Sequence, residues 1–366
     1  MTVFDVEKNK AICVLPWIHE FRQVGGSKIA PCCQADNLRD NETMASLRED
    51  MLSGIQPRAC NSCYHKEEKS GWSPRIADTV RWIKKFGEPN INSPELGYID
   101  LRFDPTCNLK CKTCGPKFST LWQKEKKVSL PANISNAEYF KTIEKKHLKK
   151  VYLAGGEPTY IKAYHDFFEE LYLINPKCEV VVNTNLKRLS DSWKQIIKKF
   201  ENLSIVCSCD AIQTLGTYVR YPLKWEEFED NVKFVKEHAN FLVFNLVASN
   251  LTTHMIHETC TWMQKYSKNI TLSPLNNPES MSELAVPLDM RQSYIDSLEK
   301  LTKFGVSPYY AMDFRSKIQF LIKRYKESAY DVALHRKLTD EISEQDSHRT
   351  LKLHSVDSFL HSWIYR

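Results

Sequence analysis

The chain has 366 residues, of which 42% are hydrophobic and 26% are charged, as in an ordinary soluble globular protein. Its net charge of +6 is spread over lysine-rich segments, and basic residues do not alternate with aromatic ones, which argues against a nucleic-acid-binding surface. No apolar run approaches the roughly 20 residues that cross a membrane, and the N-terminus lacks the plan of a signal peptide. We therefore expect a cytoplasmic protein.

Twelve cysteines in a cytoplasmic chain favour metal ligation over disulfide bonds, and eight of them lie before residue 115. The first group consists of Cys13, Cys32, Cys33, Cys60 and Cys63. Between its members we expect a hairpin over Val24–Pro31 and a helix over Thr43–Leu52. Four separated cysteines suffice for a complete zinc or iron–sulfur site. Four later cysteines stand alone and are expected to be buried structural thiols: Cys178, Cys207, Cys209 and Cys260.

A second group of cysteines follows the alternating segment Tyr98–Phe103, which is typical of a β-strand. Cys107, Cys111 and Cys114 are spaced C-x3-C-x2-C, so one loop can place three thiolates on a concave face. Thiolates are the ligands of iron–sulfur clusters and of zinc. A structural zinc site would require a fourth protein ligand, whereas three cysteines leave one metal position open for chemistry. A zinc knuckle is the alternative interpretation.

From Gly97 onward, strand-like and helix-like segments alternate, which predicts βα units around a parallel sheet. The expected strands are Tyr98–Phe103, Lys150–Ala154, Glu179–Asn183, Leu203–Ser208, Phe241–Ala248 and Asn269–Ser273. The expected helices are Phe118–Lys127, Ser135–Lys146, Ala163–Ile174, Ser190–Phe200, Lys224–His238 and His254–Tyr266. Six strands fit a partial (β/α)6 barrel of the TIM type, in which functional residues gather at the carboxyl ends of the strands.

Gly155-Gly156-Glu157-Pro158 follows the second expected strand. The two glycines let the backbone approach a ligand closely, and the carboxylate of Glu157 can accept hydrogen bonds from an ammonium group. After the fourth strand, Asp210 is expected either to cap the following loop or to face a substrate. Farther on, the guanidinium of Arg220 could bind a carboxylate in a bidentate way.

These motifs resemble the radical S-adenosylmethionine (radical SAM) superfamily. The resemblance implies that Cys107, Cys111 and Cys114 hold a [4Fe–4S] cluster whose open iron binds the amino and carboxylate groups of S-adenosylmethionine (SAM). In such enzymes the reduced cluster cleaves SAM to a 5′-deoxyadenosyl radical. Thr113 stands where the family usually has an aromatic residue, which weakens packing under the adenine. The other SAM contacts that the resemblance implies are Gly155, Gly156, Glu157, Thr184, Asn185, Ser208 and Arg220.

The first cysteine group resembles the auxiliary-cluster module called SPASM, or its shortened form Twitch. Such modules usually follow the barrel, whereas here the match precedes it. The resemblance implies an auxiliary [4Fe–4S] cluster, with Cys33 as the spare thiol, and a zinc ribbon is the alternative. The implied ligands are Cys13, Cys32, Cys60 and Cys63.

We expect an auxiliary module over residues 1–95, a barrel over 96–285 and a helical extension over 286–366 that includes a helix at Asp289–Phe304. The extension could cover the open side of the barrel, dock on the first module or contact a partner. The sequence does not choose between these.

The resemblance implies an oxidoreductase or another radical-based modifying enzyme that abstracts hydrogen from its substrate and receives electrons from a flavodoxin- or ferredoxin-like donor. Enzymes with such auxiliary clusters often oxidise or crosslink peptides or proteins, which we favour over a small molecule such as a sugar or nucleotide. A non-catalytic iron–sulfur or zinc protein is the alternative from another class. Glu157 and all three loop cysteines are present, which argues against it.

Overall fold

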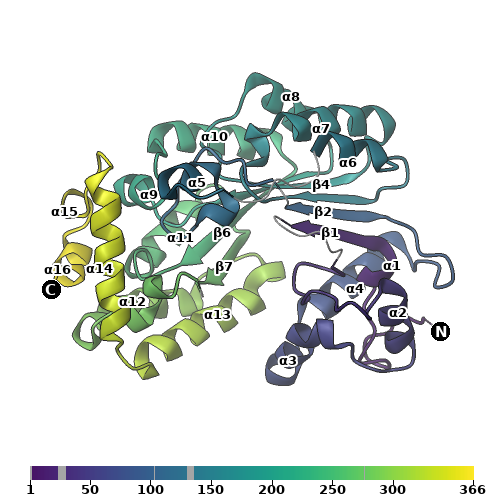
Figure 1. Cartoon of the computed structure of the whole chain (residues 1–366), viewed down its shortest axis with the longest axis horizontal. Coiled ribbons are helices and arrows are strands. Elements are labelled where there is room, and N and C mark those ends of the chain that lie inside the picture. Colours follow the sequence, from purple (N-terminus) through teal and green to yellow (C-terminus); the bar gives the residue numbers. More distant parts are fainter. Residues whose placement is uncertain (1, 24–29, 103, 130–135, 276) are drawn as a thin grey trace.

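The computed structural model describes residues 2–23, 30–102, 104–129, 136–275 and 277–366. Its centre is a seven-stranded, wholly parallel sheet in which the strands lie in sequence order (Figure 1). The strands are β1 (His19–Gln23), β2 (Tyr98–Arg102), β3 (Lys150–Leu153), β4 (Glu179–Thr184), β5 (Leu203–Ser208), β6 (Phe241–Ala248) and β7 (Ile270–Pro274). Within the described residues β1 and β7 do not pair, so the sheet is an open, partial barrel.

All six expected strands are confirmed, with ends that differ by one residue at most. The expected count of six is corrected to seven, because β1 pairs in parallel with β2 from Tyr98 to Arg102. The segment His19-Glu-Phe-Arg-Gln has little apolar alternation, and its strand conformation depends on pairing with a distant neighbour. The expected hairpin lies mostly outside the described residues, apart from an antiparallel bridge between Phe21 and Ala30.

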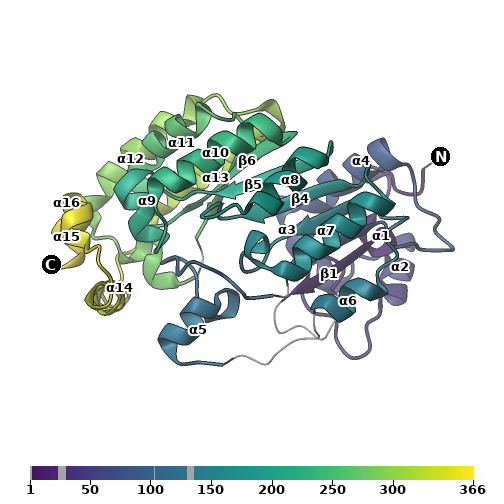
Figure 2. The same cartoon turned by 90° about the horizontal axis from the view of Figure 1, so that it is seen from above.

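Helices cover one face of the sheet, as Figures 1 and 2 show for α6, α7, α8 and α10. These outer helices are α5 (Thr120–Lys126), α6 (Asn136–Thr142), α7 (Lys162–Ile174), α8 (Asp191–Lys199), α9 (Gln213–Val219), α10 (Trp225–His238) and α11 (Ile256–Gln264). Val180 and Val182 of β4 are fully buried beneath them, whereas Glu179, Val181 and Asn183 are only half-buried on the other face. The strands therefore alternate between a packed outer face and a more open inner face.

The N-terminal part forms α1 (Leu15–Ile18), α2 (Met44–Leu52), α3 (Asn61–Ser70) and α4 (Pro74–Phe86). It has a separate hydrophobic cluster that includes Trp17 and Met51 and packs against Tyr98 of β2. The expected helix at α2 is confirmed, and the Thr43 hydroxyl caps it by accepting a hydrogen bond from the backbone N–H of Ser46. The chosen boundary at residue 95 stays a prediction.

The C-terminal part forms α12 (Arg291–Lys300), α13 (Pro308–Glu327), α14 (Val332–Ser347), α15 (Leu353–Val356) and α16 (Ser358–Ile364). Its buried side chains, such as Phe314, Leu338 and Trp363, belong to the same hydrophobic core as the barrel. Figures 1 and 2 place α14–α16 at the opposite end of the molecule from α1–α4. The extension therefore shares the hydrophobic core of the barrel, and of its described helices α13 also reaches α4 of the N-terminal part, where Tyr309 contacts Arg81. Among the described helices, none has both the length and the apolar character of a membrane span.

Helix α14 also contacts the cysteine loop from behind. Lys112, which lies between the second and third loop cysteines, is fully buried and donates from Nζ to Gln345 Oε1 at 3.0 Å and to Asp346 Oδ1 at 3.4 Å. Asp346 also accepts hydrogen bonds from the Tyr218 hydroxyl at 2.9 Å and from the Leu353 N–H at 2.7 Å. Burial lowers the pKa of Lys112 to about 7, so this ammonium depends on the partners that α14 provides.

We expect Asp346→Ala to lower the free energy of unfolding by about 3–5 kcal/mol, because it leaves the buried ammonium of Lys112 without its ion-pair partner. The matched control is Glu344→Ala, two residues earlier on the same helix. Glu344 pairs with Lys126 at 2.7 Å in an exposed position, and its loss should cost less than about 1 kcal/mol. Urea denaturation measures the free energy of unfolding of both variants. Equal losses in the two variants would contradict the stabilising role of the contact between Lys112 and Asp346.

Candidate functional site

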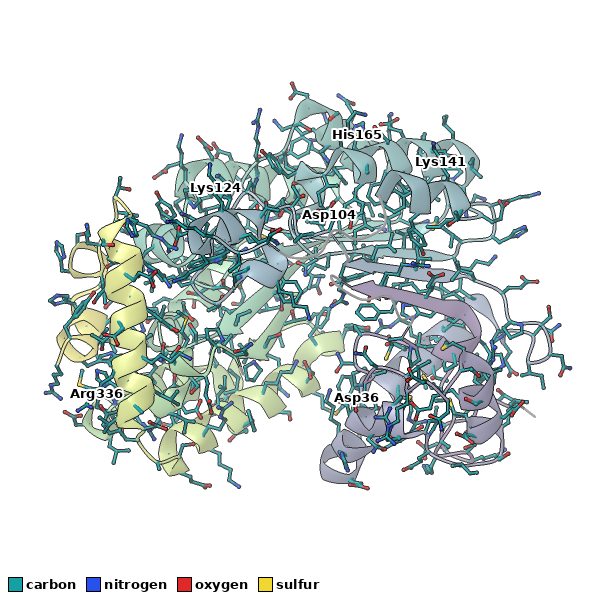
Figure 3. All side chains as sticks on the ribbon, viewed as in Figure 1. Asp36, Asp104, Lys124, Lys141, His165 and Arg336 are labelled. Carbon is teal, nitrogen blue, oxygen red and sulfur yellow. The ribbon has the colours of Figure 1, made fainter. Side chains whose placement is uncertain are left out.

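The cysteine loop leaves the carboxyl end of β2 near Asp104, which is labelled in Figure 3. Its backbone is bonded to the segment that follows α9, where Lys110 N–H donates to the Tyr221 carbonyl at 2.6 Å and Lys112 N–H to the Val219 carbonyl at 2.8 Å. On the other side, the indole N–H of Trp122 on α5 donates to the Cys111 carbonyl at 3.0 Å. Partners on two sides therefore fix the course of the loop.

The three loop thiols are free and half-buried. Burial raises the pKa of Cys107 and of Cys111 to about 12, and the proximity of Cys114 raises both further. The guanidinium of Arg220 acts in the opposite direction on both. The structure thus brings the three predicted ligands together beside one cation. Buried thiols of this kind hold their protons unless a metal replaces them.

Gly155 and Gly156 lie directly against the cysteine loop. Gly156 N–H donates to the Asp104 carbonyl, and Glu157 N–H to the Thr106 carbonyl, both at 2.8 Å. A Cβ at Gly156 would stand 2.2 Å from the Thr106 oxygen, and Gly155 has a φ of +107°. The sequence suggested that these glycines approach a ligand. The structure shows that they approach the backbone which carries the cysteines.

Glu157 joins the ends of three strands. Its buried carboxylate accepts hydrogen bonds from the hydroxyls of Thr159 at 2.6 Å and Thr184 at 2.5 Å, and from the Asn185 N–H at 2.7 Å. Burial raises the pKa of Glu157, although these hydrogen bonds favour the charged form. Asn185 in turn donates from Nδ2 to Asn108 Oδ1 at 2.8 Å within the cysteine loop. The predicted residues Glu157, Thr184 and Asn185 thus form one network with the loop, and their contact with SAM stays a prediction.

Arg220 and Asp210 form a buried ion pair at 2.8 Å, so the guanidinium of Arg220 does not lie on the protein surface. Asp210 also accepts a hydrogen bond from the Val247 N–H at 3.1 Å. The Nε of Arg220 is buried and has no hydrogen-bond partner within the described residues. Burial would lower the pKa of Arg220, but the neighbouring Cys111 and Asp210 raise it overall. This cation is therefore held beside the loop thiols with donor capacity to spare.

Ser208 lies on the inner face at the end of β5 and donates to Asn183 Oδ1 of β4 at 3.1 Å. Its neighbour Cys209 is buried on the opposite face, as strand alternation requires. The other expected structural thiols are also confirmed as buried, namely Cys178, Cys207 and Cys260. The expected contact of Ser208 with SAM stays a prediction.

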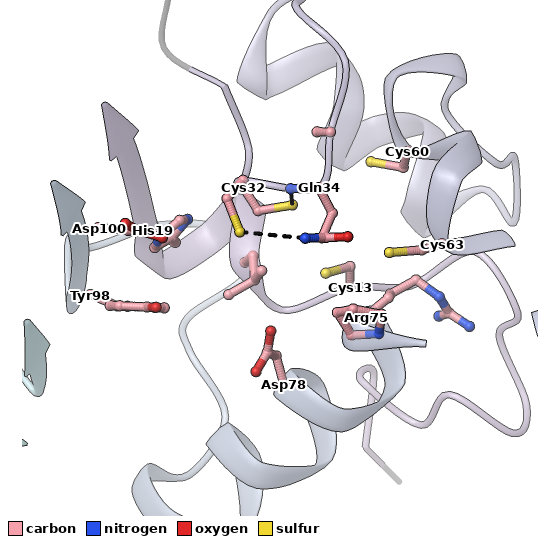
Figure 4. Close-up of a pocket in the computed structure, with 14 residues that line it drawn as sticks. Cys13, His19, Cys32, Gln34, Cys60, Cys63, Arg75, Asp78, Tyr98 and Asp100 are labelled. Atoms are coloured by element: carbon pink, nitrogen blue, oxygen red, sulfur yellow. Dashed lines mark hydrogen bonds between the residues drawn. The ribbon is translucent and has the colours of Figure 1, made fainter. Parts of the chain in front are cut away.

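The first cysteine group lines an enclosed cavity of about 90 Å³ between α1, α3, α4 and the start of β2 (Figure 4). The four expected ligands, Cys13, Cys32, Cys60 and Cys63, surround it together with Cys33. Burial raises the pKa of Cys60 to about 12, and the nearby Cys32 and Cys63 add to the rise. Cys33 is exposed at the edge of this group. Partial desolvation raises its pKa, Arg102 of β2 lowers it, and Asp100 of β2 raises it. Cys32 therefore faces the other thiols more closely than Cys33 does.

A second, larger cavity of about 590 Å³ occupies the inner face of the sheet, and we call it the lumen cavity. Polar and apolar side chains from β3 to β7 line it, and α4 and the start of α13 flank it. Its lining residues are Arg81, Lys150, Tyr152, Glu179, Val181, Asn183, Ser204, Val206, Phe241, Val243, Asn245, Asn269, Thr271, Ser307, Tyr309 and Tyr310. Most of these residues were not singled out as site residues from the sequence. The sequence feature that could have identified them is that every second residue of each strand faces the inner side of the sheet, and many of these residues are polar.

Gly156→Ala should lower the free energy of unfolding by about 1–3 kcal/mol, because the added methyl overlaps the Thr106 carbonyl and must displace the cysteine loop. Gly115→Ala is the control. It lies at the other end of the same loop, and a Cβ there meets nothing within 4 Å. Urea unfolding of the two variants tests the close approach, and a G156A variant as stable as G115A would refute it.

Residues 101–263 match the family model described as the radical SAM superfamily. No curated protein matches the chain. Similar solved structures include native anSMEcpe with bound AdoMet, at 15% identity and a TM-score of 0.41, covering 57% of this chain and 59% of that chain. SuiB from Streptococcus suis aligns at 15% identity and a TM-score of 0.41, covering 71% and 62%. The chain thus spans about three fifths of the length of these two proteins. Residues 101–263, which include the cysteine loop and the strands β3 to β6, are thus similar to the radical SAM family.

Proposed function

We propose that the protein is a radical SAM enzyme that abstracts a hydrogen atom from a peptide or protein substrate and oxidises or crosslinks it with the help of an auxiliary cluster. The observation that carries the proposal is the meeting of three loop thiols, the buried network of Glu157 and the Arg220–Asp210 pair at the carboxyl ends of neighbouring strands. The match to the radical SAM family model over the same residues supports it.

Cys107, Cys111 and Cys114 would hold the catalytic [4Fe–4S] cluster, and the donor set fits it. Three free thiols lie on one loop, and backbone hydrogen bonds from this loop to neighbouring segments fix its conformation. When bound and reduced, the cluster supplies the electron that cleaves SAM to a 5′-deoxyadenosyl radical. The acidic Glu157 and the cationic Arg220 suit the amino and carboxylate groups of the methionine part of SAM. Each would orient one end of it.

Cys13, Cys32, Cys60 and Cys63 would hold the auxiliary cluster. No three His, Cys, Asp or Glu side chains in the described part of the chain are placed to hold a single metal ion. Ligands of one zinc ion converge on one point, whereas the cysteines of a cubane cluster each bind a separate iron. Four thiols that line one cavity provide the donor set of a [4Fe–4S] cluster, whose cysteines each bind a separate iron. An auxiliary cluster here would exchange electrons with a substrate held in the neighbouring barrel.

Reconstituted without oxygen, the chain should bind about eight irons, four for each [4Fe–4S] cluster. With dithionite and SAM it should form 5′-deoxyadenosine. Cys111→Ala should keep about four irons and lose this product, because the catalytic cluster loses one of its three ligands. Cys178→Ala, which removes a buried thiol outside both groups, is the control. Deoxyadenosine formation that survives Cys111→Ala would refute the assignment, and none from the intact reduced protein would favour a non-catalytic iron–sulfur protein.

The auxiliary site has its own pair of variants. Cys60→Ala should lower the iron content by about four atoms, because Cys60 faces Cys32 and Cys63 across the cavity. Cys33→Ala should leave the iron content unchanged, since Cys33 is exposed and is the spare thiol of the group. Iron and zinc are counted together by plasma emission spectroscopy. One zinc with about four irons in the unaltered chain would make this group a zinc site.

A further inference from the structure

The lumen cavity has the size of a small-molecule or side-chain binding site, since such sites span about 300–1,000 Å³. In a filled (β/α) barrel the inner positions carry bulky branched residues that pack into a core. Here the inner positions of the described strands include Lys150, Asn183, Ser204, Asn245 and Thr271. These polar side chains are half-buried around the cavity, so they can offer hydrogen bonds to a ligand that enters it.

The amino-terminal end of the cavity carries two cations. Lys150 opens β3, and its Nζ lies 4.7 Å from the centroid of the Tyr98 ring. Within the described residues no carboxylate lies within 4 Å of Lys150 and no hydrogen-bond acceptor is recorded for its ammonium. Burial lowers its pKa against the opposing effects of Asp78 and Glu179. The half-buried Lys150 ammonium therefore has a free donor on the cavity side, which a carboxylate of a ligand could bind.

Arg81 of α4 is the second cation, and it bridges two parts of the chain. Its guanidinium lies 4.8 Å from the centroid of the Tyr309 ring on α13, and its contact with Asp78 is long, at 3.7 Å. The only other charged group that lines the cavity, Glu179, is already paired with Lys85 at 2.5 Å. The described lining is therefore positive at this end.

The other end of the lumen cavity lies towards the carboxyl ends of the strands, where the cysteine loop begins. Asn183 and Asn245 use their side-chain oxygens to accept hydrogen bonds from Ser208 and Thr271, both at 3.1 Å. The amide of Asn183 also interacts with the Tyr152 hydroxyl, and the NH2 group of Asn245 is oriented as a donor. From Lys150 to Gly155, beside the cysteine loop, the chain advances about 16 Å at about 3.3 Å per residue. A ligand anchored at Lys150 would thus extend along a donor-rich wall towards the reactive end.

We propose that the lumen cavity binds the substrate through a carboxylate held by Lys150 and Arg81, so that the substrate is an acidic peptide segment whose reacting carbon lies towards the cysteine loop. The inference rests on the proposed function, because it takes this cavity as the substrate site. Anchoring at a remote charge uses binding energy to orient the reacting carbon, as enzymes commonly do with non-reacting parts of a substrate.

The test measures binding of two blocked tripeptides, acetyl-Gly-Glu-Gly-amide and acetyl-Gly-Gln-Gly-amide, by ligand-observed saturation-transfer NMR. The protein is the full chain with its metal centres and SAM, kept without oxygen and without reductant. We expect the Glu peptide to bind about tenfold more tightly than the Gln peptide, as for a charge-assisted hydrogen bond. Because no SAM cleavage is needed, failure here and failure of the deoxyadenosine assay are separate results.

Lys150→Met should abolish most of this preference while keeping a side chain of similar length. Arg81→Gln, at a partly exposed helix position that tolerates substitution, should reduce it and keeps the test valid if Lys150→Met does not fold. Lys146→Gln is the matched control, since Lys146 is exposed, lies four residues before Lys150 and lines none of this cavity. Equal binding of the two peptides, or equal behaviour of all three variants, would overturn the proposal. Tighter binding of inorganic phosphate than of the Glu peptide would also overturn it, in favour of a phosphorylated small molecule.

Discussion

The arrangement of the candidate site depends on the close approach of two backbone segments, the turn at Gly155-Gly156 and residues 104–106 of the cysteine loop. The loop that carries Cys107, Cys111 and Cys114 leaves the sheet, so its peptide groups lose the partners that a strand would give them, and buried peptide groups must find others. The turn at Gly155-Gly156 supplies some of them by packing against residues 104–106, where a Cβ at position 156 would overlap a carbonyl. The segment at Val219–Tyr221 supplies others. The position of the cysteines is thus set by contacts with neighbouring βα units.

Buried charges surround this loop, and most have a partner. Asp210 faces Arg220, Asp346 faces Lys112, and hydroxyl and amide donors surround Glu157. Such pairs contribute little net stability, but removing one member is costly, so they fix geometry more than they add free energy. The Asp346 contact also gives the C-terminal extension a role that its sequence left open. Through Lys112, helix α14 holds the loop in place from the side opposite the barrel.

The sequence was sufficient for most of the fold because the outer face of each strand is apolar and its inner face is not. All six strands from Tyr98 onward were predicted for this reason, and the site residues follow from their ends. Strand β1 was missed because His19–Gln23 is held by pairing with β2, which no local pattern reveals. The contact between Lys112 and Asp346 spans 234 residues, so no spacing rule could find it. Likewise, Arg81 meets Tyr309 only because α4 and α13 flank the same open side of the sheet.

The polar inner face has a further consequence for how stability is distributed. Since the lumen cavity lacks a packed core, the sheet depends on its outer layer, where Phe167, Phe168 and Phe228 are almost fully buried beneath the strands. The C-terminal helices share its hydrophobic core, to which Phe314 and Trp363 belong. Packing free energy thus resides on the convex side, and the concave side is left free to select a ligand by charge and hydrogen bonding. An open sheet of this kind therefore depends for its packing on the outer helices and on the C-terminal helices that share their hydrophobic core.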